Sequence, residues 1–319
     1  MKAQVFGSMK STFGEGPLWD HETASLFWVD LAEKKILSYN FRTKEETSYQ
    51  LPEIVTAVVK YSKSQFILFM IDGFYLYDLK KQTITELWKP EGLNEKFLLN
   101  DGKCDPQGRL WAGSVNDDFK KIKEADRPPS MELLERKAFL YRIDENLSIR
   151  SVRNNITVSN GMDWDPVRNR MYYVDSATQS IFQYDFEPDT GTIKNEQVVY
   201  IFEELEGFPD GMTIDQEGML WVALFKSGKI AQKTSKHGVI AKINPMTNKW
   251  VDCITVPTSH VTSCTFGGED LKTLFITTAI EPLSEYERGH QPEAGRLFSI
   301  DLDVGGYEVN RFKGDLSLF

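Results

Sequence analysis

Four oxygen-bearing side chains occupy the same position in an internal repeat, each five residues before an aspartate that opens a turn. They are Glu15, Asn100, Asn160 and Asp210, followed by Asp20, Asp105, Asp165 and Asp215. Residues at one position of a repeat occupy one position in each structural unit. If the units surround an axis, the four side chains therefore converge on one point.

The types of these side chains indicate what they could bind. Two carboxylates, Glu15 and Asp210, and two amide oxygens, Asn100 and Asn160, form a set without thiolate or imidazole. Such a set suits one divalent cation, Ca²⁺, Mg²⁺ or Mn²⁺, and it can also accept Zn²⁺. A cation with open coordination positions polarises a carbonyl that water attacks. Asp210 is the better candidate for a general base, because an amide cannot take a proton from water.

A simpler interpretation treats these residues as turn formers. Asn160-Gly161 and Asp210-Gly211 are common turn dipeptides, and Glu15 alone would be a surface glutamate. A turn role does not require an acid or amide at the same position in four units. The second and sixth units have Val55 or Thr56 and Ser263 there. We therefore favour a binding site.

Short apolar strands follow each of these positions and recur in two further units. Their first apolar residues recur at intervals of 40 to 61 residues, at Leu26, Phe66, Leu110, Met171, Leu220 and Leu274. Within the first unit, strands are predicted near 17–19 and over 25–31, 35–42 and 46–51. The pattern predicts an all-β, six-bladed β-propeller with four antiparallel strands per blade, in one domain over residues 1–319. Residues 116–137 form an insertion, either a surface loop or a lid.

Composition limits the classes of partner. The formal net charge of −10 and the pI of about 5.1 argue against nucleic acid. We find no apolar run that suits a signal peptide or a membrane span, so we expect a cytoplasmic monomer that binds no membrane. Three cysteines without metal-ligand spacing are expected to be reduced. No motif of nucleophilic catalysis stands out.

Six short motifs resemble one known family in order along nearly the whole chain. They are Gly14–Trp19, Asn100–Gly108, Ser159–Trp164, Pro209–Asp215, Thr262–Gly268 and Gln291–Gly295. The chain is similar to the family of senescence marker protein 30 (regucalcin), gluconolactonases and firefly luciferin-regenerating enzyme. This resemblance implies a divalent metal in the central channel, held by Glu15, Asn160 and Asp210, with Asn100 near metal and substrate. It also implies hydrolysis of sugar lactones with Asp210 as the base.

The substrate end of the motif differs from the family pattern. Many relatives have an arginine two residues before the Asn-Asp-Gly motif, where it meets substrate hydroxyls, and here this residue is Leu98. The candidate substrate-binding residues are therefore Asn100, Leu98 and Asp118, which lies in the insertion. Leu98 argues against aldonolactone specificity, and it is compatible with a less polar lactone, an ester-like substrate or a nitrile-type reaction as in luciferin regeneration.

Three functions are consistent with these residues. The first is a metal-dependent lactonase or related hydrolase of carboxylic esters. The second is a calcium-binding regulatory protein without catalysis, and the third is a propeller that serves as an interaction platform. The sequence favours the first, because the candidate ligands include a potential base and leave coordination positions open.

Overall fold

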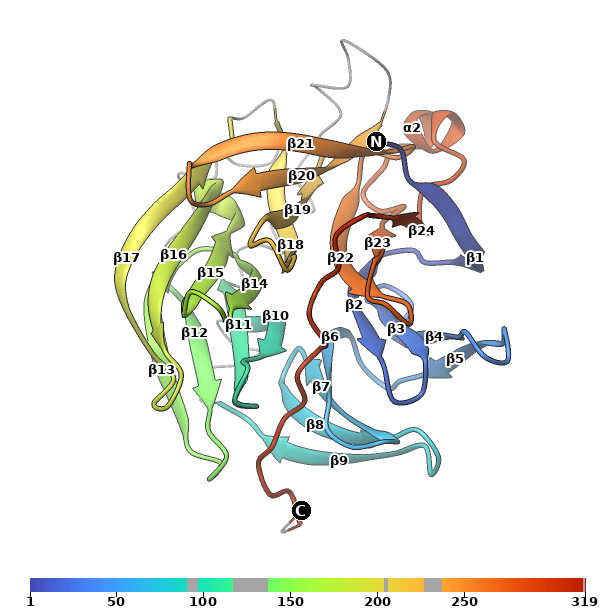
Figure 1. The fold of residues 1–319 in the computed structure, drawn as a ribbon. Helices are drawn as coiled ribbons and strands as arrows, with labels where there is room; N and C mark the ends of the chain where they lie inside the picture. The colour runs from blue at the N-terminus through green and yellow to red at the C-terminus, as the bar shows by residue number, and fades with distance from the viewer. Residues whose placement is uncertain (91–96, 117–136, 204–205, 227–236, 318) are drawn as a thin grey trace.

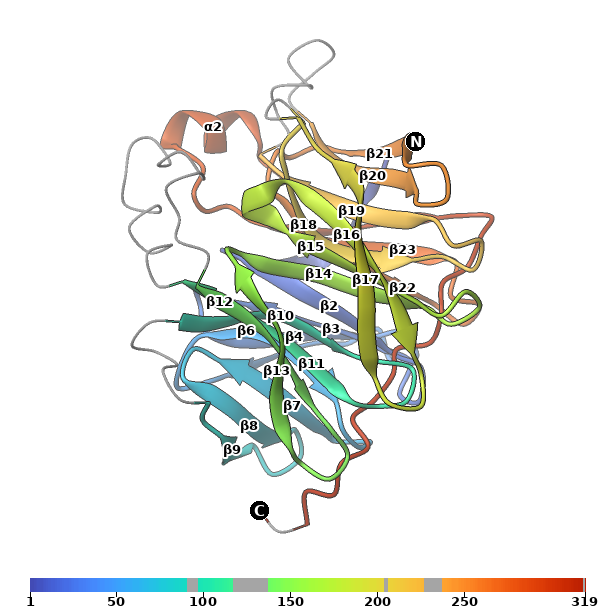
Figure 2. The same cartoon turned by 90° about the vertical axis from the view of Figure 1, so that its left-hand side faces the viewer.

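The fold is a ring of six four-stranded antiparallel sheets, which confirms the predicted six-bladed β-propeller (Figure 1). The computed structural model describes residues 1–90, 97–116, 137–203, 206–226, 237–317 and 319. In the side view, the helix α2 (Glu285–His290) and the C-terminal segment lie on opposite faces of the ring (Figure 2). We call these the α2 face and the C-terminal face.

Each blade is listed from its innermost strand outward. Blades 1 and 2 are β2 (Gly14–Asp20), β3 (Ser25–Asp30), β4 (Lys35–Asn40), β5 (Glu46–Gln50), and β6 (Val55–Lys60), β7 (Gln65–Met70), β8 (Gly73–Asp78), β9 (Thr83–Trp88). Blades 3 and 4 are β10 (Phe97–Cys104), β11 (Leu110–Asn116), β12 (Ala138–Ile143), β13 (Ile149–Ile156), and β14 (Ser159–Asp165), β15 (Arg170–Asp175), β16 (Ser180–Glu187), β17 (Thr192–Ile201). Blades 5 and 6 are β18 (Phe208–Ile214), β19 (Leu220–Phe225), β20 (Gly238–Asn244), β21 (Lys249–Val256), and β22 (Val261–Gly267), β23 (Thr273–Thr278), β24 (Arg296–Asp301), β1 (Gln4–Lys10).

The last blade is closed by the first strand of the chain. β1 pairs antiparallel with β24, with Gln4 opposite Ser299 and Phe6 opposite Leu297. The strands predicted in blade 1 are confirmed, and the innermost one is longer than predicted because it extends to Gly14. That β1 completes blade 6 was not predicted from the repeat.

Burial explains why the second strand of each blade is a continuous apolar run. Every residue of β3 and of β11 is buried, whereas the outer strand β13 is largely exposed or half-buried. Blades pack on both sides of each second strand, so side chains of both faces are removed from water, which favours uniformly apolar strands over alternating ones. The hydrophobic core therefore lies between adjacent blades.

Aspartates shape the turns at the C-terminal face, as their spacing predicted. The Oδ1 atoms of Asp105, Asp165 and Asp215 each accept hydrogen bonds from two backbone N–H groups of the turn that follows, at 2.9–3.0 Å. The Oδ2 atoms of Asp105 and Asp215 accept from the indoles of Trp111 and Trp221, both at 2.9 Å. These bonds fix the end of the innermost strand that lies on the C-terminal face. They thereby fix how the strand is oriented along the axis.

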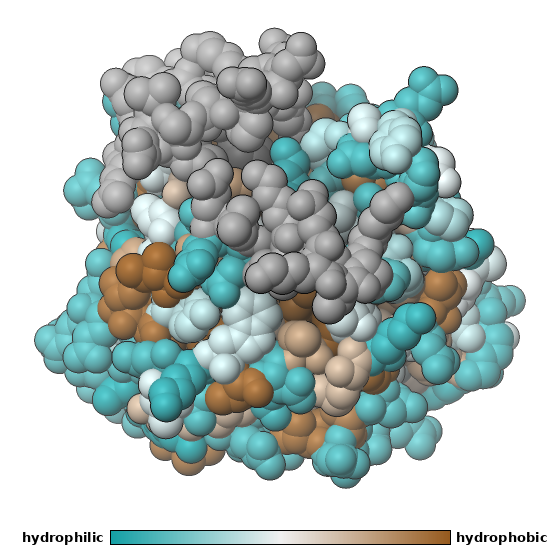
Figure 3. Space-filling view, turned by 90° about the horizontal axis from the view of Figure 1, so that it is seen from above, coloured by the Kyte–Doolittle hydropathy of each residue, from teal (hydrophilic) through white to brown (hydrophobic). Residues whose placement is uncertain are grey.

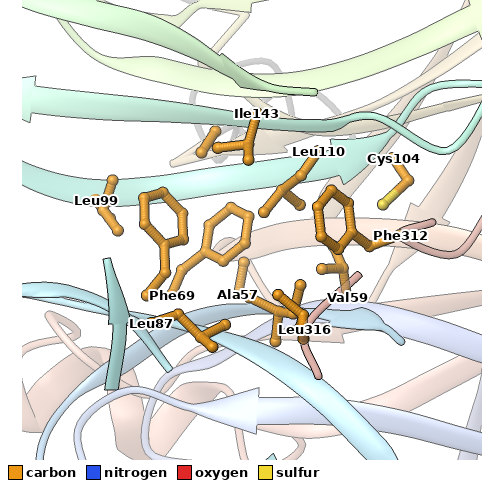
Figure 4. Close-up of a cluster of buried hydrophobic side chains, with 13 residues drawn as sticks. Ala57, Val59, Phe69, Leu87, Leu99, Cys104, Leu110, Ile143, Phe312 and Leu316 are labelled. Atoms are coloured by element: carbon orange, nitrogen blue, oxygen red, sulfur yellow. The ribbon is translucent and has the colours of Figure 1, made fainter. Parts of the chain in front are cut away.

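The C-terminal segment packs into the core between blades 2 and 3. Phe312 and Leu316 lie against Val59, Phe69 and Leu110 (Figure 4). The Phe312 N–H donates to the Lys60 carbonyl at 2.9 Å, and the Lys313 N–H donates to the Gly108 carbonyl at 3.0 Å. The segment therefore joins two neighbouring blades on the C-terminal face.

The surface seen from above in Figure 3 is largely hydrophilic, with small separate hydrophobic areas. No helix within the described residues has the length and apolar character needed to cross a membrane. Cys104, Cys253 and Cys264 are free thiols.

Removing the Phe312 ring should destabilise the protein. Phe312 is 1% exposed, and a buried Phe→Ala change typically costs about 3–5 kcal/mol. We expect Phe312→Ala to lower the urea midpoint of unfolding accordingly. Phe319→Ala is the matched control, because this ring in the same segment is 49% exposed. An equal loss in both variants would contradict a core role for Phe312.

Candidate functional site

The four predicted ligand residues lie at the heads of four innermost strands, on the α2 face. Glu15, Asn100, Asn160 and Asp210 belong to β2, β10, β14 and β18, and we call them the axial cluster. The strands surround the axis (Figure 1), so residues at their heads are brought together from blades 1, 3, 4 and 5. Asn160 and Asp210 are both 8% exposed.

A β-bulge adjoins the axial position in all six blades. The pairing register shifts between Glu15 and Leu18, between Leu99 and Gly102, and between Pro209 and Met212, and the other three blades have equivalent shifts. A bulge turns a side chain away from the regular alternation of a strand. The repeat of this irregularity explains how equal sequence positions can present their polar groups to one axis.

Glycine follows three of the axial residues, and after Asn160 and Asp210 neighbouring strands approach too closely for a side chain. A Cβ atom on Gly161 would lie 2.5 Å from the Met212 nitrogen and 2.6 Å from the Asp210 carbonyl oxygen. A Cβ atom on Gly211 would lie 2.0 Å from the Ser263 hydroxyl oxygen. The Asn-Gly and Asp-Gly dipeptides therefore lie within strands as close contacts between blades, which excludes the hairpin-turn interpretation.

Two aspartates at the ends of second strands hold the chain that leads into the site. Asp30 accepts from the N–H groups of Thr12 and Phe13 at 2.8 and 3.0 Å. Asp175 accepts in the same way from Thr157 and Val158, at 3.1 and 3.0 Å. These pairs of bonds fix the backbone directly before Glu15 and Asn160, so the axial side chains start from rigid positions.

The two axial carboxyls influence each other electrostatically. Burial raises the pKa of Glu15 well above its ordinary value, and the charges of Asp210 and Asp101 raise it further. Burial also raises the pKa of Asp210 well above its ordinary value, again with a contribution from Asp101. Hydrogen bonds from the Asn160 side chain and the Gly211 N–H partly oppose this rise in Asp210. Glu15, Asn160 and Asp210 are thus brought into one interacting group.

The two amides are oriented by specific partners. The Asn160 Nδ2 atom donates to the Ser176 hydroxyl at 3.1 Å. The Asn100 Nδ2 atom donates to the Ser159 carbonyl at 2.7 Å, which ties Asn100 to the residue next to Asn160. Because each amide nitrogen is engaged in this way, each amide oxygen can point elsewhere and serve as a ligand.

The charged residues beneath the axial cluster were not predicted from the sequence. Asp101 is the third carboxyl of the group, and burial raises its pKa while Lys103 lowers it. Lys103 forms an ion pair of 2.8 Å with Asp163, whose Oδ2 atom also accepts from the Thr213 hydroxyl and the Ile214 N–H. The only signal in the sequence was their position in the motifs that begin at Asn100 and Asn160.

A small cavity of about 40 Å³ lies along the axis below the cluster. Asp101, Lys103, Met212 and Cys264 contribute to its walls. A volume of this size has room for only one or two waters, so it is too small for an organic substrate. The axial cluster itself lies on the α2 face, so a substrate would reach it from that face.

Of the other candidate substrate residues, the structure describes Leu98 but not Asp118. Leu98 is half-buried on β10, two residues before Asn100, and it pairs with Val115 across the sheet. Asp118 lies outside the described residues, as does 117–136 of the predicted insertion.

The donor chemistry of the axial cluster fits a hard divalent cation. Among the described residues, no three His, Cys, Asp or Glu side chains form a group that could hold a metal ion by themselves. A cation here would therefore need the amide oxygens of Asn100 or Asn160 beside the carboxylates of Glu15 and Asp210. Two buried like charges without a cation are unfavourable, which is the situation that the raised pKa values of Glu15 and Asp210 describe.

A divalent cation should stabilise the folded protein more at pH 8 than at pH 5. Carboxyls with raised folded pKa values favour folding when protonated, and this contribution is lost as pH rises through those values. A cation that binds only the folded state at 100 times its Kd restores about 2.7 kcal/mol. Scanning fluorimetry of chelator-treated protein with added Ca²⁺ or Mn²⁺ measures the Tm shift. Glu15→Gln should reduce this shift, and an unchanged shift in Glu15→Gln would contradict a ligand role.

Comparison with known proteins identifies the family of the chain. Residues 13–280 match the model of the SMP-30/gluconolactonase/LRE-like region. A Bacillus subtilis relative with the provisional name sugar lactone lactonase YvrE is 42% identical over 316 residues, which cover 99% of this chain and 100% of the relative. Regucalcin of Danio rerio is 32% identical over 317 residues, 98% of this chain and 99% of its own. A solved structure of luciferin-regenerating enzyme superimposes with a TM-score of 0.82 at 29% identity, covering 95% of this chain and 96% of its own. The chain therefore belongs to the SMP-30/gluconolactonase/LRE-like family, which includes lactonases.

Proposed function

We propose that the protein hydrolyses lactones with the help of one divalent cation in the axial cluster. The observation that carries this proposal is the interaction of Glu15, Asn160 and Asp210 at one end of the propeller axis. Membership of a family with lactonase relatives supports the reaction class.

Glu15, Asn160 and Asp210 would hold the cation, and Asn100 would lie near cation and substrate. When bound, a divalent cation supplies Lewis acidity toward a carbonyl oxygen. Hydrogen bonds from the Asn160 side chain and the Gly211 N–H hold the Asp210 carboxylate in place. Burial of these groups makes their mutual orientation part of the fold.

Asp210 is the proposed general base. Water adds to the lactone carbonyl carbon while Asp210 takes one of its protons, and the ring C–O bond then breaks. The proton passes to the departing alkoxide oxygen, so the product is the open-chain hydroxy acid.

Asp210→Asn should separate proton transfer from cation binding. The amide keeps an oxygen ligand but cannot accept a proton, and loss of a general base typically lowers turnover about 10²–10⁴-fold. Glu15→Gln should instead weaken cation binding. The turnover of this variant should therefore recover at saturating cation. Steady-state kinetics on a lactone panel with Ca²⁺, Mn²⁺, Mg²⁺ and Zn²⁺ measure both effects.

Two outcomes would change this proposal. Wild-type turnover in Asp210→Asn would remove Asp210 from the reaction. Tight cation binding without turnover of any lactone would instead support a calcium-binding regulatory protein.

Leu98→Arg should shift preference toward polyhydroxylated lactones. An apolar residue leaves a substrate hydroxyl without its partner, which costs roughly 1–3 kcal/mol. We therefore expect wild-type kcat/KM to be higher for unsubstituted δ-valerolactone than for gluconolactone, with the ratio moving about tenfold or more in Leu98→Arg. Leu98→Met, which keeps volume and polarity, is the control. If the wild type prefers gluconolactone and Leu98→Arg changes nothing, position 98 does not set specificity.

A further inference from the structure

An aromatic stack lies beside the axial cluster, built from blades 1, 5 and 6. The ring of Phe225 stacks on the imidazole of His260, with centroids 4.5 Å apart and planes at 14°. The ring of Phe13 is also nearly parallel to Phe225, at 6.1 Å and 25°. Flat groups in this arrangement present aromatic faces that can bind another flat group.

Backbone pairing places this stack next to the two axial carboxylates. Phe13 precedes Glu15 by two residues, and its N–H is held by Asp30. Phe225, at the end of β19, lies opposite Phe208, which precedes Asp210 by two residues. Phe225 also forms a β-bridge with His260. The aromatic groups therefore lie close to Glu15 and Asp210 on the α2 face. Strand pairing and a β-bridge position them, and no long loop is needed.

The stack belongs to a wider apolar layer around the same approach. In all six blades the residue two positions before the axial position is apolar. Leu98, Phe208 and Val261 lie in their innermost strands, and Phe13, Ile54 and Val158 directly precede theirs. Val158 and Val261 are buried, whereas the other four are half-buried and present part of their surface.

His260 contributes to the stack as a neutral ring. Burial and the charge of Lys226 lower its pKa to about 3, although Glu287 acts in the opposite direction. Its Nδ1 atom is buried and has no hydrogen-bond partner among the described residues. The Lys226 ammonium lies 5.9 Å from the Phe225 centroid. The imidazole thus supports Phe225 from behind as an apolar surface.

We propose that Phe13, Phe208 and Phe225, backed by His260, form an aromatic wall that binds a flat apolar substituent on the lactone ring. The substrate class would be aryl-substituted lactones, in preference to polyhydroxylated ones. This inference rests on the proposed lactonase function and names its substrate. Phe13, Phe208 and Phe225 act as specificity-determining residues, because they contact the substituent and not the carbonyl that reacts.

The test compares a phenyl-substituted δ-lactone with δ-valerolactone and gluconolactone, using cation-loaded protein. We expect the wild type to have a KM about tenfold lower for the phenyl-substituted lactone than for δ-valerolactone. Phe225→Ala should raise the KM for the phenyl-substituted lactone about tenfold, with kcat kept within about threefold and KM for δ-valerolactone unchanged. Phe225→Tyr keeps an aromatic ring and should therefore keep the low wild-type KM for the phenyl-substituted lactone. If Phe225→Ala does not fold, Phe225→Leu removes the ring while keeping apolar volume.

Tyr286→Ala is the matched control, because Tyr286 also packs against a histidine, His290, but is 71% exposed on α2. It should leave all three KM values unchanged. Equal wild-type KM values for the phenyl-substituted lactone and δ-valerolactone would overturn the wall, as would a Phe225→Ala variant that raises both equally.

Failure of the lactonase proposal gives a different result. If no lactone is hydrolysed with any cation, calorimetric titration with the phenyl-substituted hydroxy acid still measures binding at the aromatic wall. Binding to the wild type that is lost in Phe225→Ala would support the wall alone. No binding to the wild type would overturn it.

Discussion

The close approach of six innermost strands to one axis is the constraint on which the rest of the structure depends. Strands that meet this tightly leave no room for a side chain after Asn160 and Asp210, so both are followed by glycine. The same convergence places like charges together, and the raised pKa values of Glu15 and Asp210 record that conflict. Buried like charges lower the stability of the folded protein. They are common at sites that bind a cation or perform proton transfer.

Charge compensation in the channel is layered along the axis. The upper layer holds Glu15 and Asp210 with Asp101 close by, and the only nearby cation among the described contacts is Lys103 below them. Lys103 is itself committed to Asp163, which also receives a backbone and a hydroxyl hydrogen bond. The protein therefore neutralises the lower layer with its own side chains and leaves the upper layer to whatever binds there.

Most of the fold could be predicted from the sequence, because repeat period and strand composition are local signals. The aspartates at the turns and the four axial residues share one position in each unit, so a single pattern predicted both. Asp101 and Lys103 were missed because their role depends on a bulge, which changes the direction of side chains without a composition signal. The stacking of Phe225 on His260 was also beyond prediction, since it joins blades 5 and 6 through a single bridge.

The closure of blade 6 by β1 has a consequence for synthesis of the protein. Gln4 must wait for Ser299, its partner in β24, to leave the ribosome before the ring can close. At translation rates of about 5–20 residues per second, the first strand stays unpaired for roughly 15 to 60 s. During that time five blades can form as an open arc whose two ends expose apolar sheet faces. Aggregation in the cell is therefore a risk of the nascent chain more than of the finished ring.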